Sequence, residues 1–188
     1  MSILKIARMG HPVLRNVARD LTPEEIRSPE IHRLIQDMIE TMKEYGGIGL
    51  AAPQVHHSLQ LAVIGYSDEN PRYPKQGKQP LTVLINPQVT VLNDEEQGFW
   101  EGCLSIPELR GLVYRPRKIQ IDHLDEEGKP QRIIAEDFLA TVFQHELDHL
   151  QGVPFIDRIR DTTKLAFLEE YRRYWLPAEE DEVGELED

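Results

Sequence analysis

Two histidines and a glutamate within residues 144–149 (QHELDH) have the types and spacing of a catalytic metal site. His145 and His149 are four residues apart, so on a helix of 3.6 residues per turn they lie on one face and can bind one ion. Glu146 lies beside them, where a carboxylate can act as a general base. The motif therefore favours a metal site with a general base beside it, although a helix with satisfied polar side chains also fits it.

The residues around this motif predict a buried helix, because apolar side chains cover most of its circumference. These side chains are Phe138, Leu139, Val142, Phe143, Leu147 and Leu150. Asp137 is the expected N-cap, and Gly152 is expected to end the helix. Burying histidines and carboxylates without partners is costly, so we expect charged groups or a metal ion around them.

A catalytic metal needs a third protein ligand and a position left open for water. One extended protease motif requires a further histidine where this chain has Phe155, which excludes that class. A second protease class takes a glutamate from a downstream helix, as Glu169 would be. Cys103 is the other candidate, because a thiolate beside a cation binds metals, although a free cysteine is more often a small buried apolar residue. Spacing alone leaves Glu169 and Cys103 open.

Hydrophobic periodicity places the remaining elements. A strong amphipathic helix is predicted to begin at Ser28-Pro29, to continue to Tyr45 and to end at Gly46-Gly47. A capping box at residues 22–25 predicts a short helix before it, and Asp161 is expected to cap a last helix that stops at Pro177. The middle of the chain predicts strands, with a loop over residues 67–80 and an interruption at Asn86-Pro87. The strands are expected at residues 59–66, 81–92, 113–124 and 132–135. This order indicates an α+β domain over residues 1–177.

Composition excludes several classes of protein. The single cysteine, Cys103, excludes an internal disulfide and suits a reducing cytoplasm. The sequence shows neither a signal peptide nor an apolar run long enough to span a membrane. The net charge is −12, and residues 178–188 contribute seven acidic side chains and no basic one, which leaves −5 for the rest. This charge argues against direct binding to duplex nucleic acid, and the acidic tail is predicted to be solvated and disordered.

A stretch of small residues, 47–54 (GIGLAAPQ), contains two glycines that permit close approach of a ligand backbone. It lacks the third glycine of a dinucleotide fingerprint and the Gly-Lys-Ser/Thr of a P-loop, so a phosphate cradle is excluded. Gln54 ends the stretch as a neutral hydrogen-bond donor.

Three segments together resemble the signatures of peptide deformylases, in the order and spacing of that family: residues 47–54 (GIGLAAPQ), 101–105 (EGCLS) and 144–150 (QHELDHL). The opening residues 10–15 (GHPVLR) are also similar, so the resemblance spans roughly residues 1–170. It implies an α+β fold in which mixed, mainly antiparallel strands wrap around a central helix that carries the two histidines. It also implies that Cys103, and not Glu169, joins His145 and His149 as a metal ligand.

The resemblance implies a bacterial-type, metal-dependent hydrolase that removes the formyl group from N-formylmethionine of newly made polypeptides and releases formate. Glu146 would transfer protons, and Gln54 with the backbone N–H of Leu104 would stabilise the charge on the formyl oxygen. Glu101 and Asp148 would orient the site, for which a plain structural ion pair is the alternative. One divalent ion is expected, natively Fe²⁺, with Ni²⁺, Co²⁺ or Zn²⁺ as replacements.

The resemblance also suggests how the substrate binds. Its main chain would add as a strand beside Gly49. An apolar pocket for the methionine would be lined by Ile48, Phe99, Phe138 and Val142, although core packing explains each of these equally well. Arg110 would bind a substrate carbonyl, with a plain surface arginine as the alternative. The expected partners are N-formylmethionyl nascent peptides and, transiently, the ribosome, but the acidic tail argues against stable docking on RNA.

Overall fold

A computed structural model describes residues 2–66 and 78–176. Its elements are η1 (Pro12–Arg15), α1 (Pro23–Ile26), α2 (Pro29–Glu44), β1 (Gly49–Ala51), η2 (Ala52–Val55), β2 (Leu61–Tyr66), β3 (Gln79–Cys103), β4 (Ile106–Leu124), β5 (Pro130–Glu136), α3 (Asp137–Leu150), η3 (Phe155–Arg158), η4 (Thr162–Lys164), β6 (Leu165–Phe167) and α4 (Leu168–Tyr174). No helix among the described residues is long and apolar enough to cross a bilayer. The predicted acidic tail and most of the predicted loop over residues 67–80 lie outside the described residues.

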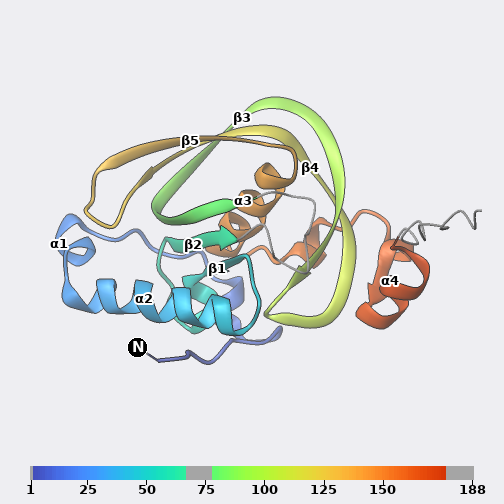
Figure 1. Cartoon of the computed structure of the whole chain (residues 1–188), viewed down its shortest axis with the longest axis horizontal. Coiled ribbons are helices and arrows are strands. Elements are labelled where there is room, and N and C mark those ends of the chain that lie inside the picture. Colours follow the sequence, from blue (N-terminus) through green and yellow to red (C-terminus); the bar gives the residue numbers. More distant parts are fainter. Residues whose placement is uncertain (1, 67–77, 177–188) are drawn as a thin grey trace, which may run out of the picture.

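One antiparallel sheet organises the molecule, with strand order β1-β2-β3-β4-β5 and β6 paired to β4. Figure 1 shows β3, β4 and β5 arching over α3, while α2 lies beside β1 and β2 and α4 lies at the far end. The fold prediction, an α+β arrangement of mainly antiparallel strands around a central helix, is confirmed.

The hairpin of β3 and β4 is much longer than the sequence pattern predicts. Its register shifts at four places, between Ile85 and Gln88 and three more times before Cys103. Each shift marks an irregular point of the ladder, and such points bend and twist a strand pair. The first coincides with the predicted interruption, where Asn86 has a positive φ of 50°. The curved hairpin thereby carries Cys103, at the end of β3, over α3.

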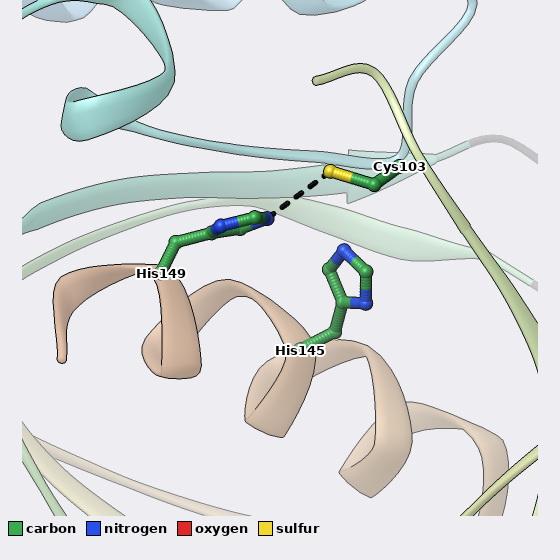
Figure 2. A group of neighbouring side chains, drawn as sticks. All are labelled: Cys103, His145 and His149. Atoms are coloured by element: carbon green, nitrogen blue, oxygen red, sulfur yellow. Dashed lines mark hydrogen bonds between the residues drawn. The ribbon is translucent and has the colours of Figure 1, made fainter. Parts of the chain in front are cut away.

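Helix α3 lies inside this curve and is buried on most sides, as its apolar sequence predicts. Gly152, with a φ of 71°, follows the helix end at the expected place. The predicted N-cap is wrong by one residue, because Asp137 is the first residue of the helix and the cap position is Glu136. The Asp137 side chain accepts a hydrogen bond from Arg117 instead. Figure 2 shows how the helix presents His145 and His149 on successive turns towards Cys103.

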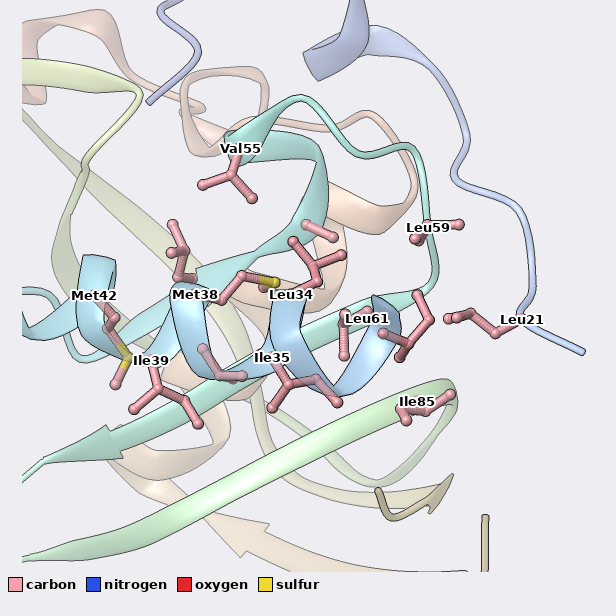
Figure 3. Packing of buried hydrophobic residues seen from close by; sticks show 14 of the residues in the cluster. Leu21, Leu34, Ile35, Met38, Ile39, Met42, Val55, Leu59, Leu61 and Ile85 are labelled. Carbon is pink, nitrogen blue, oxygen red and sulfur yellow. The ribbon is translucent and has the colours of Figure 1, made fainter. Parts of the chain in front are cut away.

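Helix α2 closes the other side of β1 and β2. Ser28 caps it by accepting from the backbone N–H of Ile31, and Gly46 follows its end with a φ of 62°. Its buried stripe packs into one cluster with Leu61 and Ile85 of the sheet (Figure 3). The stripe contains the six predicted residues, Ile31, Leu34, Ile35, Met38, Ile39 and Met42. Full burial of each such side chain contributes about 1.5–3 kcal/mol, so this cluster fixes β1 firmly.

The predicted final helix begins later than expected. Asp161 does act as a cap, but of the short η4, where its side chain accepts from the N–H of Thr163. Leu165–Phe167 then forms β6 on the edge of β4, and α4 starts only at Leu168. Pairing with β4 therefore outweighs local helix propensity in this segment.

Candidate metal centre

Three side chains from two distant segments converge over α3. The ligand atoms of Cys103, His145 and His149 all lie within 4.8 Å of one another. Nε2 of His149 is 3.3 Å from Sγ of Cys103 (Figure 2). Nδ1 of His145 is 2.7 Å from a carboxylate oxygen of Glu101, which leaves its Nε2 for a ligand. Ligand atoms about 2.0–2.3 Å from a shared tetrahedral ion lie roughly 3.5 Å apart, so one sulfur and two imidazoles fit such an ion.

The charges in this cluster also suit a cation. Burial opposes ionisation of Cys103, but the neighbouring His149 and a hydrogen bond from His145 outweigh it and hold the pKa of the thiol well below its usual value. Burial likewise opposes protonation of His145, yet hydrogen bonds to Cys103 and Glu101 raise its pKa. These neighbours therefore favour the thiolate form, which is the form that binds metals.

A buried network of ion pairs holds Glu101, the carboxylate that contacts His145. Arg115 donates to both oxygens of Glu101, at 2.6 and 3.0 Å, and to Asp148 at 2.7 Å. Asp148 also receives two hydrogen bonds from Arg158. Burial would raise the pKa of Glu101, but the hydrogen bonds from His145 and Arg115 lower it to about 2. Glu101 is thus a carboxylate that fixes the orientation of the His145 ring.

Hydrogen-bond donors surround the sulfur on its other side. The Gln54 amide donates to Sγ of Cys103 at 3.3 Å and to the Ser105 hydroxyl at 3.4 Å, while its carbonyl oxygen accepts from the N–H of Ala51. The backbone N–H of Ser105 donates to the same sulfur at 3.4 Å. Gln54 and Cys103 are 49 residues apart in sequence, and the fold brings them together.

The Glu146 side chain lies next to β1, against Gly49. The side chain is buried, and its Oε2 has no hydrogen-bond partner among the described residues. Burial raises the pKa of this carboxyl, and the neighbouring His145 and His149 oppose the rise only in part. A Cβ at Gly49 would overlap the Glu146 carboxylate, so the glycine is what permits β1 to pass this closely. A buried carboxyl with one unpartnered oxygen, next to a group that can bind a metal, can exchange protons with a bound substrate.

A small, mainly apolar cavity opens beside these groups. Its lining includes the four residues predicted for the methionine pocket, Ile48, Phe99, Phe138 and Val142. The other lining residues are Trp100, Glu101, Gly102, Thr141, His145 and Glu146. A larger cavity of about 590 Å³ lies behind α3, but its lining is dominated by glutamines and by charged residues such as Arg158 and Arg160. An apolar side chain fits the smaller cavity better on chemical grounds.

Two sequence candidates lie outside these groups. Arg110 does not line the small cavity; its guanidinium packs against Gly102, where a Cβ would overlap it. The Glu169 side chain is 83 % exposed on α4 and does not belong to the converging metal-binding group.

Sequence reasoning missed Arg115 and Ser105. Arg115 occupies a buried position in β4, and a charge in the alternating series of the apolar residues Val113, Ile119 and Ile121 was the available signal. Ser105 follows Cys103 within a recognised segment, but nothing in its type indicated that its backbone N–H bonds the sulfur.

Comparisons with known proteins agree on one family. The family model for polypeptide deformylase matches residues 3–165. Peptide deformylase from Leptospira biflexa is 42 % identical over 170 residues, covering 90 % of this chain and 95 % of that protein. Peptide deformylase 1 from Bordetella pertussis is 46 % identical over 164 residues, covering 87 % of this chain and 92 % of that protein.

Solved structures show the same likeness. A class I type b peptide deformylase from Acinetobacter baumannii with bound Met-Ala-Ser superposes with a TM-score of 0.80 at 34 % identity, covering 85 % of this chain and 100 % of that chain. A peptide deformylase from Synechococcus elongatus in complex with actinonin has a TM-score of 0.77 at 36 % identity, covering 92 % of this chain and 86 % of that chain.

Proposed function

This chain belongs to the peptide deformylase family, and from that premise we propose that Cys103, His145 and His149 hold its metal ion while Glu146 transfers protons. The protein is a hydrolase that removes the formyl group from N-formylmethionine of newly made polypeptides and releases formate. The observation that carries the assignment of residues is the convergence of one cysteine sulfur and two imidazoles beside a buried carboxyl whose Oε2 has no partner among the described residues.

Glu146 has the position and proton affinity for two proton transfers. A divalent ion held by the three ligands would supply Lewis acidity, which lowers the pKa of water and polarises the formyl carbonyl. Glu146 accepts a proton from the water that attacks the formyl carbon, and it then delivers that proton to the departing amine nitrogen. Its raised pKa suits this exchange, because the carboxyl must release the proton as readily as it takes it.

Negative charge develops on the formyl oxygen during the attack, and the neutral amide of Gln54 lies on the sulfur side of the site. Gln54 has an amide N–H within reach of Cys103, and its carbonyl is fixed by Ala51 so that the amide cannot rotate freely. We assign Gln54 and the backbone N–H of Leu104 to stabilise the oxygen. Removal of one such donor typically lowers turnover about 10²–10³-fold.

The substrate is proposed to bind as an additional strand. Among the described residues β1 pairs only with β2, so its second edge can accept a peptide backbone beside Gly49. The methionine side chain then enters the small cavity between Ile48, Phe99, Phe138 and Val142. Arg110, beside Gly102 at the adjacent hairpin, is assigned to a downstream carbonyl of the peptide. The Acinetobacter baumannii relative binds Met-Ala-Ser, which supports a peptide in this position.

The ion is proposed to be Fe²⁺ natively, with Ni²⁺, Co²⁺ or Zn²⁺ as replacements. A mixed thiolate and imidazole site accepts all four, so affinity alone does not select among them. Metal analysis of anaerobically purified protein tests the identity. Iron-loaded protein should lose activity in air faster than nickel-loaded protein, and catalase should slow that loss, because iron and the thiolate are both oxidised readily. Equal half-lives for the two forms would contradict the proposal.

We also propose that the protein acts in the cytoplasm, where its substrates are made, and that it contacts the ribosome only transiently. Residues 1–177 are assigned to the catalytic domain. The acidic residues 178–188 would be repelled by ribosomal RNA, so a stable complex through them is not expected.

One experiment tests the ligand set and the reaction together. Cys103→Ala should lose metal and deformylation of a formyl-methionyl peptide, whereas Glu169→Ala should retain both. Glu146→Gln should retain metal while turnover falls about 10²–10⁴-fold. If Glu169→Ala loses the metal and Cys103→Ala keeps it, the site is that of a metallopeptidase and the assignment is wrong.

A further inference from the structure

The turn that carries Cys103 is held in place by the N-terminal segment. Residues 7–9 run beside it and make two backbone hydrogen bonds: the N–H of Ala7 donates to the Gln54 carbonyl at 2.7 Å, and the N–H of Met9 donates to the Ser105 carbonyl at 2.9 Å. Gln54 and Ser105, which both donate a hydrogen bond to the sulfur, are therefore anchored by the same short segment.

Arg8 lies between these two anchors and adds a side-chain contact. Its guanidinium donates to the backbone carbonyl of Leu104 at 2.9 Å. That carbonyl belongs to the same peptide unit as the N–H of Ser105, which donates to Sγ of Cys103 at 3.4 Å. A cation that hydrogen-bonds the oxygen of a peptide polarises the unit and strengthens the bond made by its N–H.

We propose that Arg8 is a positioning residue of the metal centre, which holds the Leu104–Ser105 peptide so that its N–H stays directed at the sulfur of Cys103. The inference rests on the proposed function in one respect, namely that Cys103 is a metal ligand. It goes beyond that proposal because Arg8 touches neither metal nor substrate and lies outside the three signature segments. The alternative is a surface arginine whose contact with Leu104 is incidental, and this predicts no effect on the metal.

Cobalt-loaded protein gives two readouts that do not depend on turnover. One is the rate at which Co²⁺ is lost to a chelator, and the other is the thiolate-to-cobalt charge-transfer absorption. Arg8→Met removes the hydrogen-bond donor and the charge. Arg8→Lys keeps a positive charge and a donor but replaces the planar guanidinium by a single ammonium group. Arg33→Met is the matched control, because Arg33 is an exposed arginine on α2 and the change in charge is the same.

Arg8→Met should lose Co²⁺ about five- to tenfold faster than the unchanged protein and should shift the charge-transfer band; the factor is smaller than for a buried charge-assisted hydrogen bond because the Arg8 contact is exposed. Arg8→Lys should recover most of the difference, and Arg33→Met should match the unchanged protein. If Arg8→Met and Arg33→Met release Co²⁺ at the same rate with the same band, the inference is refuted. Cys103→Ala, measured in parallel, tests the premise separately: retention of Co²⁺ and of the band there would overturn the proposed ligand set itself.

Discussion

Replacing Arg115 by methionine should damage both the stability of the fold and the metal centre. Arg115 is only 3 % exposed, and its guanidinium holds Glu101 through two hydrogen bonds and Asp148 through a third. Methionine fills similar space but offers no donor. The change therefore leaves the Glu101 carboxylate buried with His145 as its one remaining partner among these contacts.

The expected cost follows from the burial of the pair. Removing one partner of a buried ion pair typically costs about 3–5 kcal/mol, because the other charge stays in a poorly solvated place. Against a total stability of about 5–15 kcal/mol, the variant should still fold. In a chain of this length each kcal/mol lowers Tm by about 2–4 °C, so the expected drop is about 6–20 °C. Metal affinity should fall about 10–100-fold, since Glu101 would no longer fix the His145 ring.

Thermal unfolding and chelator competition measure these two effects. Arg158→Met is the matched control, because Arg158 contacts the same Asp148 but its side chain is 48 % exposed. Exposed ion pairs contribute about 0–1 kcal/mol, so the control should lose at most about 4 °C. Equal Tm values for Arg115→Met and Arg158→Met would refute the reasoning.

A double variant separates the structural role of Arg115 from its role at the site. Arg115→Met combined with Glu101→Leu removes both charges, and replacing a buried pair by apolar residues is often close to neutral. Tm should therefore recover. Metal affinity should not recover, because Nδ1 of His145 has then lost its acceptor. Recovery of both quantities together would show that Glu101 does not orient the ring.

Three further changes test other parts of the structure. Gly49→Ala places a Cβ against the Glu146 carboxylate and should lower turnover up to about 100-fold with little effect on Tm; near-normal turnover would contradict that contact. A hydrogen bond from Arg19, aided by the N–H of Thr22, lowers the pKa of Glu25 from 4.5 to about 2, so its stabilisation is complete above pH 4.5 and is lost as the pH falls towards 2. In urea unfolding, the advantage of the unchanged protein over Glu25→Gln should therefore shrink between pH 5 and pH 2, and a constant difference would rule out this linkage. Deleting residues 178–188 should leave Tm and peptide turnover unchanged, and a clear fall in either would show that they contribute to the domain.

Local patterns in the sequence predicted the two long helices well. In α2 the apolar period, the Ser28 cap and Gly46 all indicate the same helix, and the structure contains it. The same patterns ended this strand at residue 92, whereas β3 continues to Cys103, because residues 93–96 are exposed and polar. That part of β3 is stabilised by backbone pairing with β4 and not by burial of its own side chains, and pairing between distant segments leaves no periodic signal.

The candidate site was predictable to the extent that its chemistry lies in short segments. His145, Glu146 and His149 follow from helical spacing alone. Cys103 does not, since one isolated cysteine has no spacing to read, and the resemblance to a family was needed to prefer it over Glu169. Arg115 was missed because an arginine is usually at the surface, and its partners Glu101 and Asp148 lie 14 and 33 residues away.

The position of Cys103 also predicts that the proposed metal centre depends on parts of the chain that contain no ligand. Two of the three proposed ligands share the rigid frame of α3, so their separation is set by helical geometry. The third lies at the end of a curved hairpin whose direction is determined by four shifts of register, and small changes along such a hairpin would accumulate at its tip. Contacts at the tip must therefore correct the position of the sulfur. The structure provides them on both sides, through Arg115 and Glu101 at the histidines and through Gln54 and Ser105 at the sulfur.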